Sequence, residues 1–394
     1  RWDPQFQFAG YYAALWKGYY ADVEIDVEIR PAWYTDKKLL ASTQEVAEGR
    51  ADFGIGAGDI LTARDAGAPL VLLAAFFQRS PVEIYIRKDT NYQSLADLTT
   101  MKVFRNVNDT PDVELQAMLR AEGIDPRMVE PVTDISYFEA VNKFKKGEIE
   151  AFMGYSIASP FLIKDELPNT YVLRAENYGI AFYGDSLFTH QRLIDENPEL
   201  VERFTEASKK GWMYALDHTA EIAVQLSKET LRIASPPDLL AYNLFQADNI
   251  RELMIYPNVD VGNIRPARWQ KMHQYLRDAK LVNGELNLDS FIFNPEHRKT
   301  LFLEKSLEIG AIIGLIVIAL LVGFYVVNRS LRGEVNRRTS LLVKSEQKYK
   351  HLIENQALMT GQFLPDSTVI YANELYADNY GENVDQIIGK NFSK

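Results

Sequence analysis

Residues 309–327 read IGAIIGLIVIALLVGFYVV, an apolar run without a charged residue. A helix rises about 1.5 Å per residue, so this run would span roughly 28 Å, close to the hydrocarbon thickness of a bilayer. Glu304 and Glu308 precede the run, whereas arginines follow it at positions 329, 332, 337 and 338. A buried core helix is the alternative, but an arginine excess on one flank is typical of the cytoplasmic end of a membrane span. We therefore predict one transmembrane helix, with the residues before it outside the cytoplasm and those after it inside.

The composition limits the classes of function. The chain has 394 residues, enough for two or three folding units, and a formal net charge of −11. No basic domain is evident, so we expect no nucleic-acid partner. The absence of cysteine excludes disulfides, thiolate catalysis and cysteine-ligated metals. The histidines lack metal-like spacing and are expected at the surface, at His190, His218, His273, His297 and His351.

Both ends of the sequence suggest a fragment. The first residues, Arg-Trp-Asp-Pro, lack the apolar core of a secretion signal, although an external domain needs export. The last four, Asn-Phe-Ser-Lys, read like an internal position. We therefore expect a longer protein that carries a signal segment before this sequence and an output domain after it.

Helical and strand patterns alternate before the apolar run, which predicts an α/β fold. Alternating apolar and acidic residues at 23–29 are typical of a half-buried strand, and the unbroken apolar run at 70–77 of a strand covered on both faces. Further strands are predicted at 51–55 and 82–86, and residues 183–188 are expected to return the chain to the first lobe. Helices are predicted at 9–16, 39–48, 114–122, 136–145, 198–217, 239–253 and 266–279.

A weak internal repeat indicates two similar lobes. Residues 44–56 (QEVAEGRADFGIG) resemble residues 142–154 (NKFKKGEIEAFMG), and Gly49 corresponds to Gly147. Ligands of open α/β sheets bind where strand ends face a cleft, so we expect a site between the lobes. The predicted organisation is lobe 1 at about 1–85 and 186–295, lobe 2 at about 86–185, a linker at 296–308, the transmembrane helix at 309–327, a coiled-coil helix at 328–355 and a further domain at 346–394.

Several motifs in residues 1–295 resemble the NMT1/THI5-like family. They are WDPQFQFAGYY (2–12), KGYY (17–20), DFGI (52–55), FQRSP (77–81), YGI (178–180), FYGD (182–185), GW (211–212) and YA (214–215). The resemblance implies a two-lobed type II periplasmic binding protein fold that binds pyrimidine precursors of thiamine. The family's pyrimidine synthase branch uses pyridoxal phosphate held by a lysine and a histidine, together with cysteines. Residues 54–64 contain neither lysine nor histidine, so we expect binding without a cofactor.

The candidate ligand-binding residues follow from these motifs. A flat nitrogen-rich ring needs aromatic faces for stacking and a few polar groups at its edge, such as an amide or a carboxylate that accepts from an exocyclic amine. For each aromatic residue a place in the core is the equal alternative, and Gln78 and Ser80 could instead cap the turn before Pro81. The candidates are Trp2, Gln7, Phe8, Tyr11, Gly56, Gln78, Ser80, Tyr155, Tyr178, Tyr183 and Asp185.

Two patterns follow the apolar run. Residues spaced alternately by four and three positions form an imperfect heptad seam. The seam predicts a parallel homodimeric coiled coil, and a single solvated helix is the alternative. The seam residues are Leu331, Val335, Arg338, Leu342, Ser345, Tyr349 and Leu352. Residues 346–394 resemble the first half of a PAS domain, an α+β sensor fold, through SEQKY (345–349), VIYAN (369–373) and IIGKNF (387–392). Asn373 is expected to form a turn.

Together these features predict a receptor in the bacterial inner membrane. Its periplasmic domain would bind a small pyrimidine-like molecule and signal through the span, the coiled coil and the PAS domain to an output domain, which by resemblance is a histidine kinase or a cyclic-dinucleotide enzyme. A membrane-tethered binding protein of an ABC transporter is the second hypothesis. A pyrimidine-forming enzyme is the third, and the missing lysine, histidine and cysteines count against it.

Overall fold

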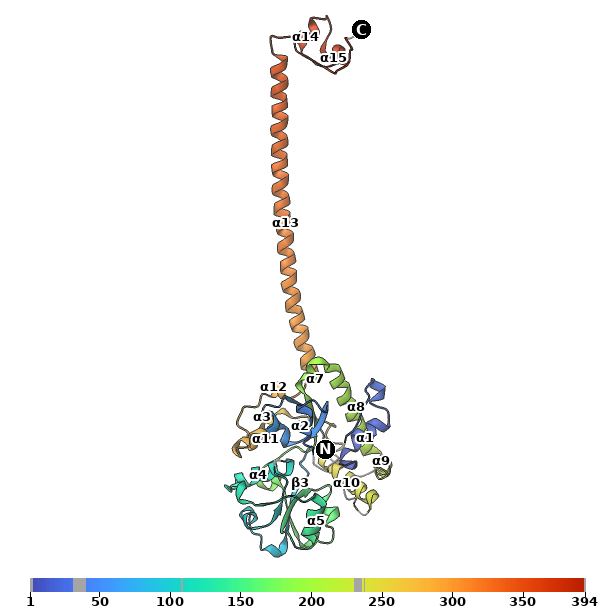
Figure 1. Cartoon of the computed structure of the whole chain (residues 1–394), viewed down its shortest axis with the longest axis vertical. Coiled ribbons are helices and arrows are strands. Elements are labelled where there is room, and N and C mark those ends of the chain that lie inside the picture. The colour runs from blue at the N-terminus through green and yellow to red at the C-terminus, as the bar shows by residue number, and fades with distance from the viewer. Residues whose placement is uncertain (1–2, 31–39, 108, 230–235, 237, 393–394) are drawn as a thin grey trace. The chain divides into compact units, whose positions relative to one another are not determined.

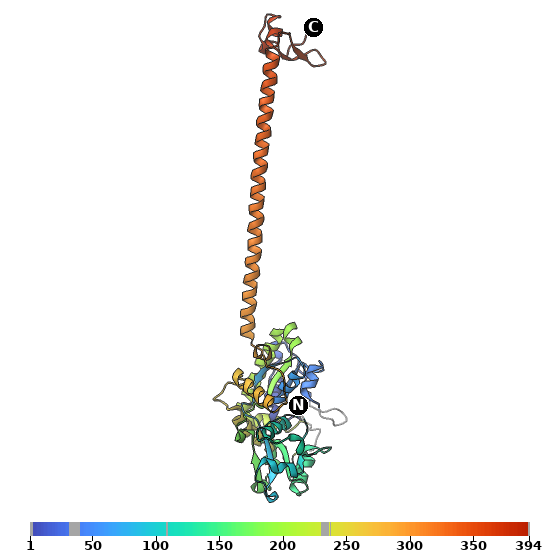
Figure 2. The ribbon, with the colours of Figure 1, turned by 90° about the vertical axis from the view of Figure 1, so that its left-hand side faces the viewer.

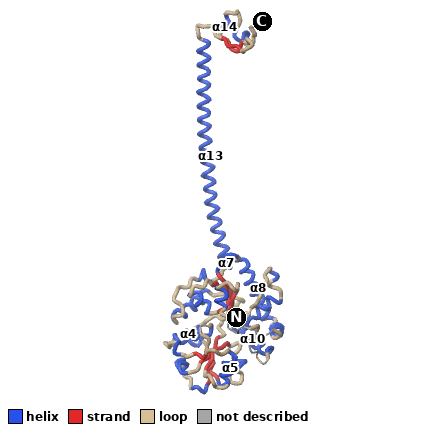
Figure 3. Tube along the Cα trace, in the orientation of Figure 1, coloured by secondary structure: helices blue, strands red, loops and turns tan. Residues whose placement is uncertain are grey.

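The computed structural model describes residues 3–30, 40–107, 109–229, 236 and 238–392 (Figure 1). It divides into two compact units, Arg1–Arg298 and Lys299–Lys394. Within the first unit the strands gather into two separate groups (Figure 3). We call the part around the three-stranded sheet lobe 1 and the part around the five-stranded sheet lobe 2.

Lobe 1 is built on an antiparallel sheet of order β1-β8-β2, in which β1 is Phe53–Gly56, β8 is Ser186–His190 and β2 is Leu70–Ala75. Every residue of β2 is buried, as expected for a strand covered on both faces. The helices of this lobe are η1 (Phe6–Phe8), α1 (Ala9–Trp16), η2 (Ala21–Val23), α2 (Ser42–Ala47), α3 (Gly58–Asp65), α7 (Gln191–Glu196), α8 (Pro198–Asp217), α9 (Thr219–Leu226), α10 (Leu239–Met254), α11 (Pro266–Asp278) and α12 (Leu288–Phe291).

Lobe 2 has a mixed sheet of order β5-β4-β6-β3-β7. Its strands are β3 (Val82–Arg87), β4 (Val103–Phe104), β5 (Pro131–Val132), β6 (Ala151–Tyr155) and β7 (Thr170–Leu173). Strand β3 pairs antiparallel with β6 and β7, whereas β4 runs parallel to β5 and β6. Its helices are η3 (Lys88–Thr90), η4 (Leu95–Thr100), α4 (Thr110–Ala121), η5 (Pro126–Met128), α5 (Tyr137–Lys145), α6 (Ser159–Leu162), η6 (Leu167–Asn169) and η7 (Ala175–Tyr178).

The internal repeat corresponds to one helix–strand unit in each lobe. Helix α2 leads into β1, and α5 leads into β6. Between helix and strand the chain turns at Gly49 and Gly147, which have φ of +73° and +75°. Glycine adopts this left-handed conformation without the strain that a Cβ atom would cause, so both helices end where the sequence predicts.

Two crossovers join the lobes, and they are hydrogen-bonded to each other. The first runs from Phe76 to Pro81, between β2 and β3. The carbonyl oxygen of Asp185, in the returning crossover, accepts from the backbone N–H groups of Phe76 at 3.0 Å and Phe77 at 3.1 Å. The two connections are therefore tied to each other by backbone hydrogen bonds.

Three sequence predictions differ from the structure. The predicted strand at 23–29 does not form: Val23 ends η2, and residues 25–30 have alternating burial but lie on the core of lobe 1 without a ladder partner among the described residues. His273 is wrong as a surface residue: it lies on the inner face of α11 and is only 4% exposed. Of the predicted helix 39–48 only Ser42–Ala47 is helical, and residue 39 lies outside the described residues.

A single continuous helix, α13 (Pro295–Glu354), contains the apolar run and the heptad seam (Figures 1 and 2). Within the described residues, its segment Leu303–Glu354 is long and apolar enough to cross a membrane, with a mean hydropathy of 2.8 in its most apolar window. None of that window is buried by other parts of the protein. This supports a membrane span over a core helix, because a core helix would be covered.

A small α/β fold follows α13. Strands β9 (Gly361–Phe363) and β10 (Val369–Ala372) pair antiparallel, and α14 (Glu374–Asp378) and α15 (Val384–Ile387) come next. Asn373 is fully buried: its Oδ1 accepts from the N–H groups of Thr360 at 2.9 Å and Tyr376 at 3.1 Å. Asn373 therefore caps α14 and ties the preceding loop to it, which confirms the turn-forming role.

Candidate ligand-binding site

The two lobes are in direct contact. One hydrophobic cluster includes buried residues of both, among them Leu72 of β2 and Ile84 of β3. Elsewhere Phe161 of α6 packs edge-on against Tyr242 of α10, with 5.4 Å between the ring centroids, and lies 5.6 Å from the ring of Phe245. We refer to this contact between α6 and α10 as the lobe boundary.

Gln7 and Asp185 meet in the interior of lobe 1. The Gln7 amide nitrogen donates to the Asp185 carboxylate over 2.7 Å, and both side chains are buried. The Gln7 side-chain oxygen accepts from the Gln5 amide at 2.9 Å, and Tyr242 donates to the Gln5 oxygen at 3.3 Å. A hydrogen bond to a charged group contributes about 1.5–3 kcal/mol, so Asp185 fixes the position of the N-terminal segment.

Polar residues of α10 hold the same segment from the other side. Asn243 Oδ1 accepts from the backbone N–H of Phe6 at 2.8 Å, and Gln246 Oε1 accepts from that of Gln7 at 3.2 Å. These N–H groups lie in the first turn of a helical segment and have no partner within it. The buried side-chain oxygens of Asn243 and Gln246 accept from them instead. The sequence analysis missed this face of α10. Tyr242, Asn243 and Gln246 share one face of α10, but the helix carries further polar residues, so its sequence pattern did not single out this face. The further polar residues are Asp248, Asn249, Arg251 and Glu252.

Phe8 and Tyr11 belong to the core of lobe 1. The Tyr11 ring packs edge-on against Phe76 at 5.7 Å and Trp212 at 5.9 Å. Burial raises the pKa of the Tyr11 hydroxyl well above its usual range. The ring is therefore held between α1, α8 and the first crossover, and the core alternative describes its place in this structure.

Gln78 and Ser80 are engaged within the protein. Gln78 Nε2 donates to the carbonyl oxygens of Ala75 at 2.8 Å and Asn263 at 3.0 Å. Ser80 donates to Glu114 Oε1 at 2.5 Å and accepts from the N–H of Val82 at 3.1 Å. Both side chains thus stabilise the first crossover, as the capping alternative predicts.

The remaining candidates are dispersed. Tyr178 lies beside Tyr92, with 3.4 Å between the hydroxyls, and Tyr183 stacks on Trp269 at 5.4 Å. Tyr155 is partly buried and packs against the hydrophobic clusters of both lobes. Gly56 is a packing position, where a Cβ atom would approach Ile60 to 2.7 Å. Trp2 lies outside the described residues.

Lobe 2 contributes a polar cluster that the sequence analysis did not identify. Glu83 of β3 is 2% exposed; it accepts from Arg174 Nε at 2.6 Å and from the Tyr85 hydroxyl. Beside it the hydroxyls of Tyr137 and Ser159 are 2.8 Å apart. A buried carboxylate in the middle of a sheet destabilises a protein unless it is paired. Arg174 and Tyr85 supply the partners of Glu83 here.

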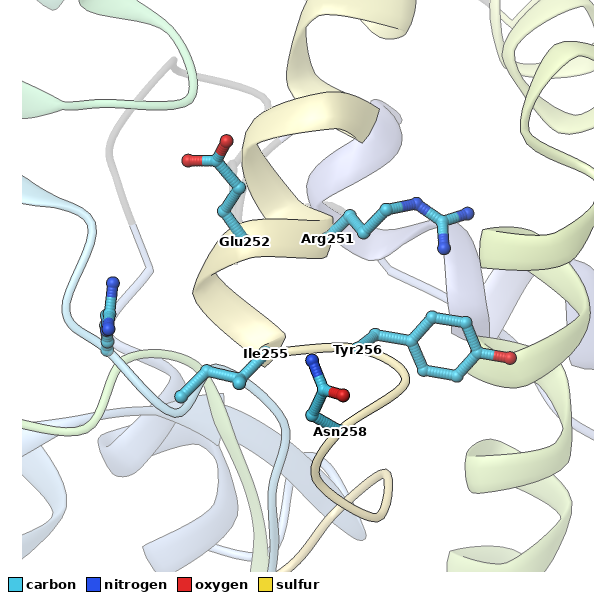
Figure 4. Close-up of a pocket in the computed structure, with 6 residues that line it drawn as sticks. Arg251, Glu252, Ile255, Tyr256 and Asn258 are labelled. Carbon is cyan, nitrogen blue, oxygen red and sulfur yellow. The ribbon is translucent and has the colours of Figure 1, made fainter.

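Two surface cavities lie elsewhere. The first, of about 360 Å³, surrounds the end of α10 and is lined by Arg79, Arg251, Glu252, Ile255, Tyr256 and Asn258 (Figure 4). The side chains of Arg251 and Tyr256 extend to the same side of it, where Tyr256 donates to Asp217 at 2.8 Å. The second, of about 410 Å³, lies between α8 and residues 260–264. Neither cavity is lined by Gln7 or Asp185.

In the part of the chain that the structure describes, no three histidine, aspartate or glutamate side chains are grouped so that they could hold a metal ion. The buried polar groups of the site are hydroxyls, amides and two carboxylates. Such a set can orient a ligand by hydrogen bonds, and aromatic rings beside it can stack on a flat ring.

Comparison with known proteins agrees with these features. The family model described as NMT1/THI5 like matches residues 5–222. The riboflavin-binding protein RibY of Chloroflexus aurantiacus is 24% identical over 296 residues, which are 74% of this chain and 82% of that protein. The formylaminopyrimidine-binding protein of Halalkalibacterium halodurans is 24% identical over 280 residues, 70% of this chain and 82% of that protein.

Solved structures show the same fold. The alkanesulfonate-binding protein SsuA of Xanthomonas axonopodis, bound to MOPS, aligns with a TM-score of 0.55 at 15% identity, covering 73% of this chain and 96% of that one. The periplasmic aliphatic sulphonate-binding protein of Escherichia coli aligns with a TM-score of 0.53 at 15% identity, covering 74% and 90%. The first unit therefore has a periplasmic binding protein fold, and the chain belongs to the NMT1/THI5-like family.

Proposed function

We propose that this chain is the sensing part of a receptor in the bacterial inner membrane, whose first unit binds a small pyrimidine-like ligand in the periplasm. The observation that carries the proposal is the continuity of α13, which contains the apolar run and then continues as a helix to Glu354, before the small α/β fold. A tether would end soon after the membrane. A helix that continues into a folded domain can transmit a movement of the lobes.

The ligand class rests on the relatives and on the site. The two relatives are named for binding riboflavin and a formylaminopyrimidine, which both contain flat nitrogen heterocycles. The lobe boundary combines aromatic rings at Phe161, Tyr242 and Phe245 with the amide of Gln5, which accepts from the Tyr242 hydroxyl. These are the residue types that a flat ring with a polar edge requires.

Signalling would follow from lobe closure. A ligand shifts a receptor only if it binds one state better than the other, and a site between two hinged lobes binds best when they are closed. Within this proposal residues 346–394 are a PAS-type domain, and α13 forms a homodimeric coiled coil that leads to an output domain.

A tethered binding protein of an ABC transporter is the second candidate. Structural neighbours that bind sulfonates for transport favour it, although they share only the fold. The discriminating experiment replaces residues 328–394 by a short soluble tail. In cells, ligand uptake should persist in a tether, whereas a ligand-dependent transcriptional or enzymatic response should disappear in a sensor.

Calorimetry on the purified chain in nanodiscs tests the ligand class directly. The panel contains riboflavin, a formylaminopyrimidine, thiamine and, as a sulfonate without a ring, taurine. Micromolar binding, about −8 kcal/mol, to a heterocycle but not to taurine is the expected result. Binding of taurine alone, or of nothing by a folded protein, contradicts a pyrimidine-like ligand.

A further inference from the structure

Helix α11 contacts both lobes and the crossover that returns the chain from lobe 2 to lobe 1. It packs against α4 of lobe 2 and against α3 of lobe 1. Two hydrogen bonds attach it to the returning crossover: the Arg268 guanidinium donates to the carbonyl oxygen of Phe182 at 2.8 Å, and the Tyr275 hydroxyl donates to that of Gly179 at 2.9 Å. Because the crossover joins the lobes, a movement between them acts directly on α11.

Trp269 of α11 lies between this crossover and the part of the chain that leads to α13. Its indole stacks on the Tyr183 ring, with 5.4 Å between the centroids, and meets the Phe291 ring edge-on at 5.3 Å. All three rings are fully buried. Close-packed side chains have no free volume around them, so they transmit a displacement instead of absorbing it. A shift of the crossover therefore reaches Phe291 through one side chain.

Phe291 belongs to residues 288–294, which we call the connecting segment because α13 follows it directly. Helix α12 forms the first part of this segment. Beyond α12, the backbone N–H of Phe293 donates to the carbonyl oxygen of Leu72 at 2.9 Å, and Ile292 forms a parallel bridge with the same residue of β2. The connecting segment is therefore held along the outer edge of the lobe-1 sheet, immediately before the long helix.

The cavity of about 410 Å³ between α8 and residues 260–264 adjoins the connecting segment. Its lining includes Ile292, Phe293 and Asn294 of that segment. A group that borders empty space can shift without displacing packed atoms, whereas the buried Phe291 ring cannot. The connecting segment can therefore move toward the cavity but not toward the core.

We infer that α11 couples the position of the lobes to α13, through the contact between Trp269 and Phe291. With the lobes together, as in this structure, α11 holds the connecting segment on β2; when the lobes separate, the segment shifts toward the cavity and the bond from Phe293 to Leu72 opens. The inference rests on the proposed function, because signalling by lobe closure requires such a connection. Trp269 and Phe291 are positioning residues, since they act on the connecting segment and not on a ligand.

The two lobe positions can be set without a ligand, because the chain has no cysteine. Phe161→Cys and Phe245→Cys place two thiols across the lobe boundary, where the native rings are 5.6 Å apart. A short bifunctional thiol reagent then holds the lobes together, whereas capping both thiols with pyrene maleimide wedges them apart. Hydrogen exchange, followed by mass spectrometry on the full chain in nanodiscs, reports the protection of residues 288–294 in each state.

We expect the connecting segment to exchange about fivefold more slowly, or slower still, when the lobes are held together, the lower end of the coupling between linked sites. In Phe291→Leu the two states should differ by about twofold or less, because leucine is apolar but loses the edge contact with Trp269. Trp269→Phe, which shortens the other ring, should act in the same way. Phe144→Leu is the matched control: Phe144 of lobe 2 is equally buried and meets Phe152 edge-on at 4.8 Å, so this variant should keep the difference.

Val261→Phe tests the part played by the cavity. Val261 lines the cavity, and a phenylalanine there would fill part of the space into which the connecting segment moves. The segment should then exchange slowly in both lobe positions. A difference between the two positions as large as in the parent double-cysteine chain would show that the cavity is not used, and would overturn this part of the inference.

The remaining outcomes are distinct. If the connecting segment of the parent double-cysteine chain exchanges equally in both lobe positions, or if Phe291→Leu and Trp269→Phe keep the full difference, the coupling is wrong. Loss of the difference in Phe144→Leu as well would identify a general loss of stability and would also overturn it. Ligand binding is measured separately by calorimetry, so these results leave the ligand class of the proposed function standing, and a folded chain that binds nothing in the panel loses that class alone.

Discussion

Gly211 of α8 lies so close to Gly10 of α1 that a Cβ atom on Gly211 would be 2.1 Å from the carbonyl oxygen of Gly10. The two helices approach to backbone contact here, and the Trp212 indole covers Gly10 in the same way, 2.1 Å from its ideal Cβ. Since η1 leads directly into α1, this contact also sets the position of Gln7.

Gly211→Ala should therefore destabilise the first unit. The obstacle is a backbone carbonyl, which cannot move aside, so the helices must separate at a cost of about 1–3 kcal/mol. Urea unfolding followed by tryptophan fluorescence measures the change. Gly58→Ala is the matched control, because a Cβ there meets its nearest atom at an ordinary 3.5 Å; an equal loss in both variants would contradict the explanation.

Gln78→Ala should lower stability without changing ligand affinity. The substitution leaves the carbonyl oxygens of Ala75 and Asn263 without their side-chain donor, which costs about 1–3 kcal/mol. Gln7→Ala, in contrast, removes the amide that donates to the Asp185 carboxylate and should weaken binding of the heterocycles of the panel. Urea denaturation measures the stability of both variants, and calorimetry measures their ligand affinity. A loss of affinity in Gln78→Ala would instead indicate that Gln78 contacts the ligand.

His273 should make stability depend on pH. Burial lowers the pKa of this side chain, and the opposing charges of Asp65 and Arg277 are smaller influences. The unfolded chain then takes up the proton at a higher pH than the folded protein, so stability rises with pH and is lost as the pH falls below about 6.5. His273→Met should flatten this slope, which is at most about 1.4 kcal/mol per pH unit. An unchanged slope in urea titrations between pH 5 and 7 would assign it to other groups.

Local signals in the sequence predicted the elements well. Helix α8 begins at Pro198 after the cap residue Asn197 and ends at Asp217, as predicted, because capping and helix breaking depend on neighbouring residues. The segment 25–30 shows the limit of such signals. Its alternating burial was predicted correctly, but whether a strand forms depends on a partner, which a local pattern does not specify.

The candidate site was predicted only in part, for the same reason. Gln7 and Asp185 lie 178 residues apart in the chain, and the family resemblance was what marked both. The partners of Gln78 and Tyr183, Asn263 and Trp269, come from distant segments, so nothing local distinguished a structural role from a ligand contact. Tyr242 and Glu83 were missed because a polar residue in a helix or strand gives no local sign that it is buried.

The homodimer proposed for α13 makes a prediction about its exposed seam. Leu342 lies on the heptad seam and Leu341 beside it, and both are exposed in the single chain, at 69% and 58%. A parallel coiled coil would bury Leu342 against its copy, so Leu342→Asp should abolish dimers and Leu341→Asp should not. Because the chain has no cysteine, disulfide formation from one introduced cysteine can report the dimer.

Ser345→Cys places the reporter on the seam, and Ser340→Cys is its matched control away from it. In membranes treated with a mild oxidant, two parallel helices hold the copies of residue 345 side by side, so Ser345→Cys should cross-link much faster than Ser340→Cys. Adding Leu342→Asp should remove the difference. Equal, slow cross-linking at both positions would instead identify residues 328–354 as a single solvated helix. A movement of the lobes would then have to be transmitted to the following fold by one helix, without a helical partner.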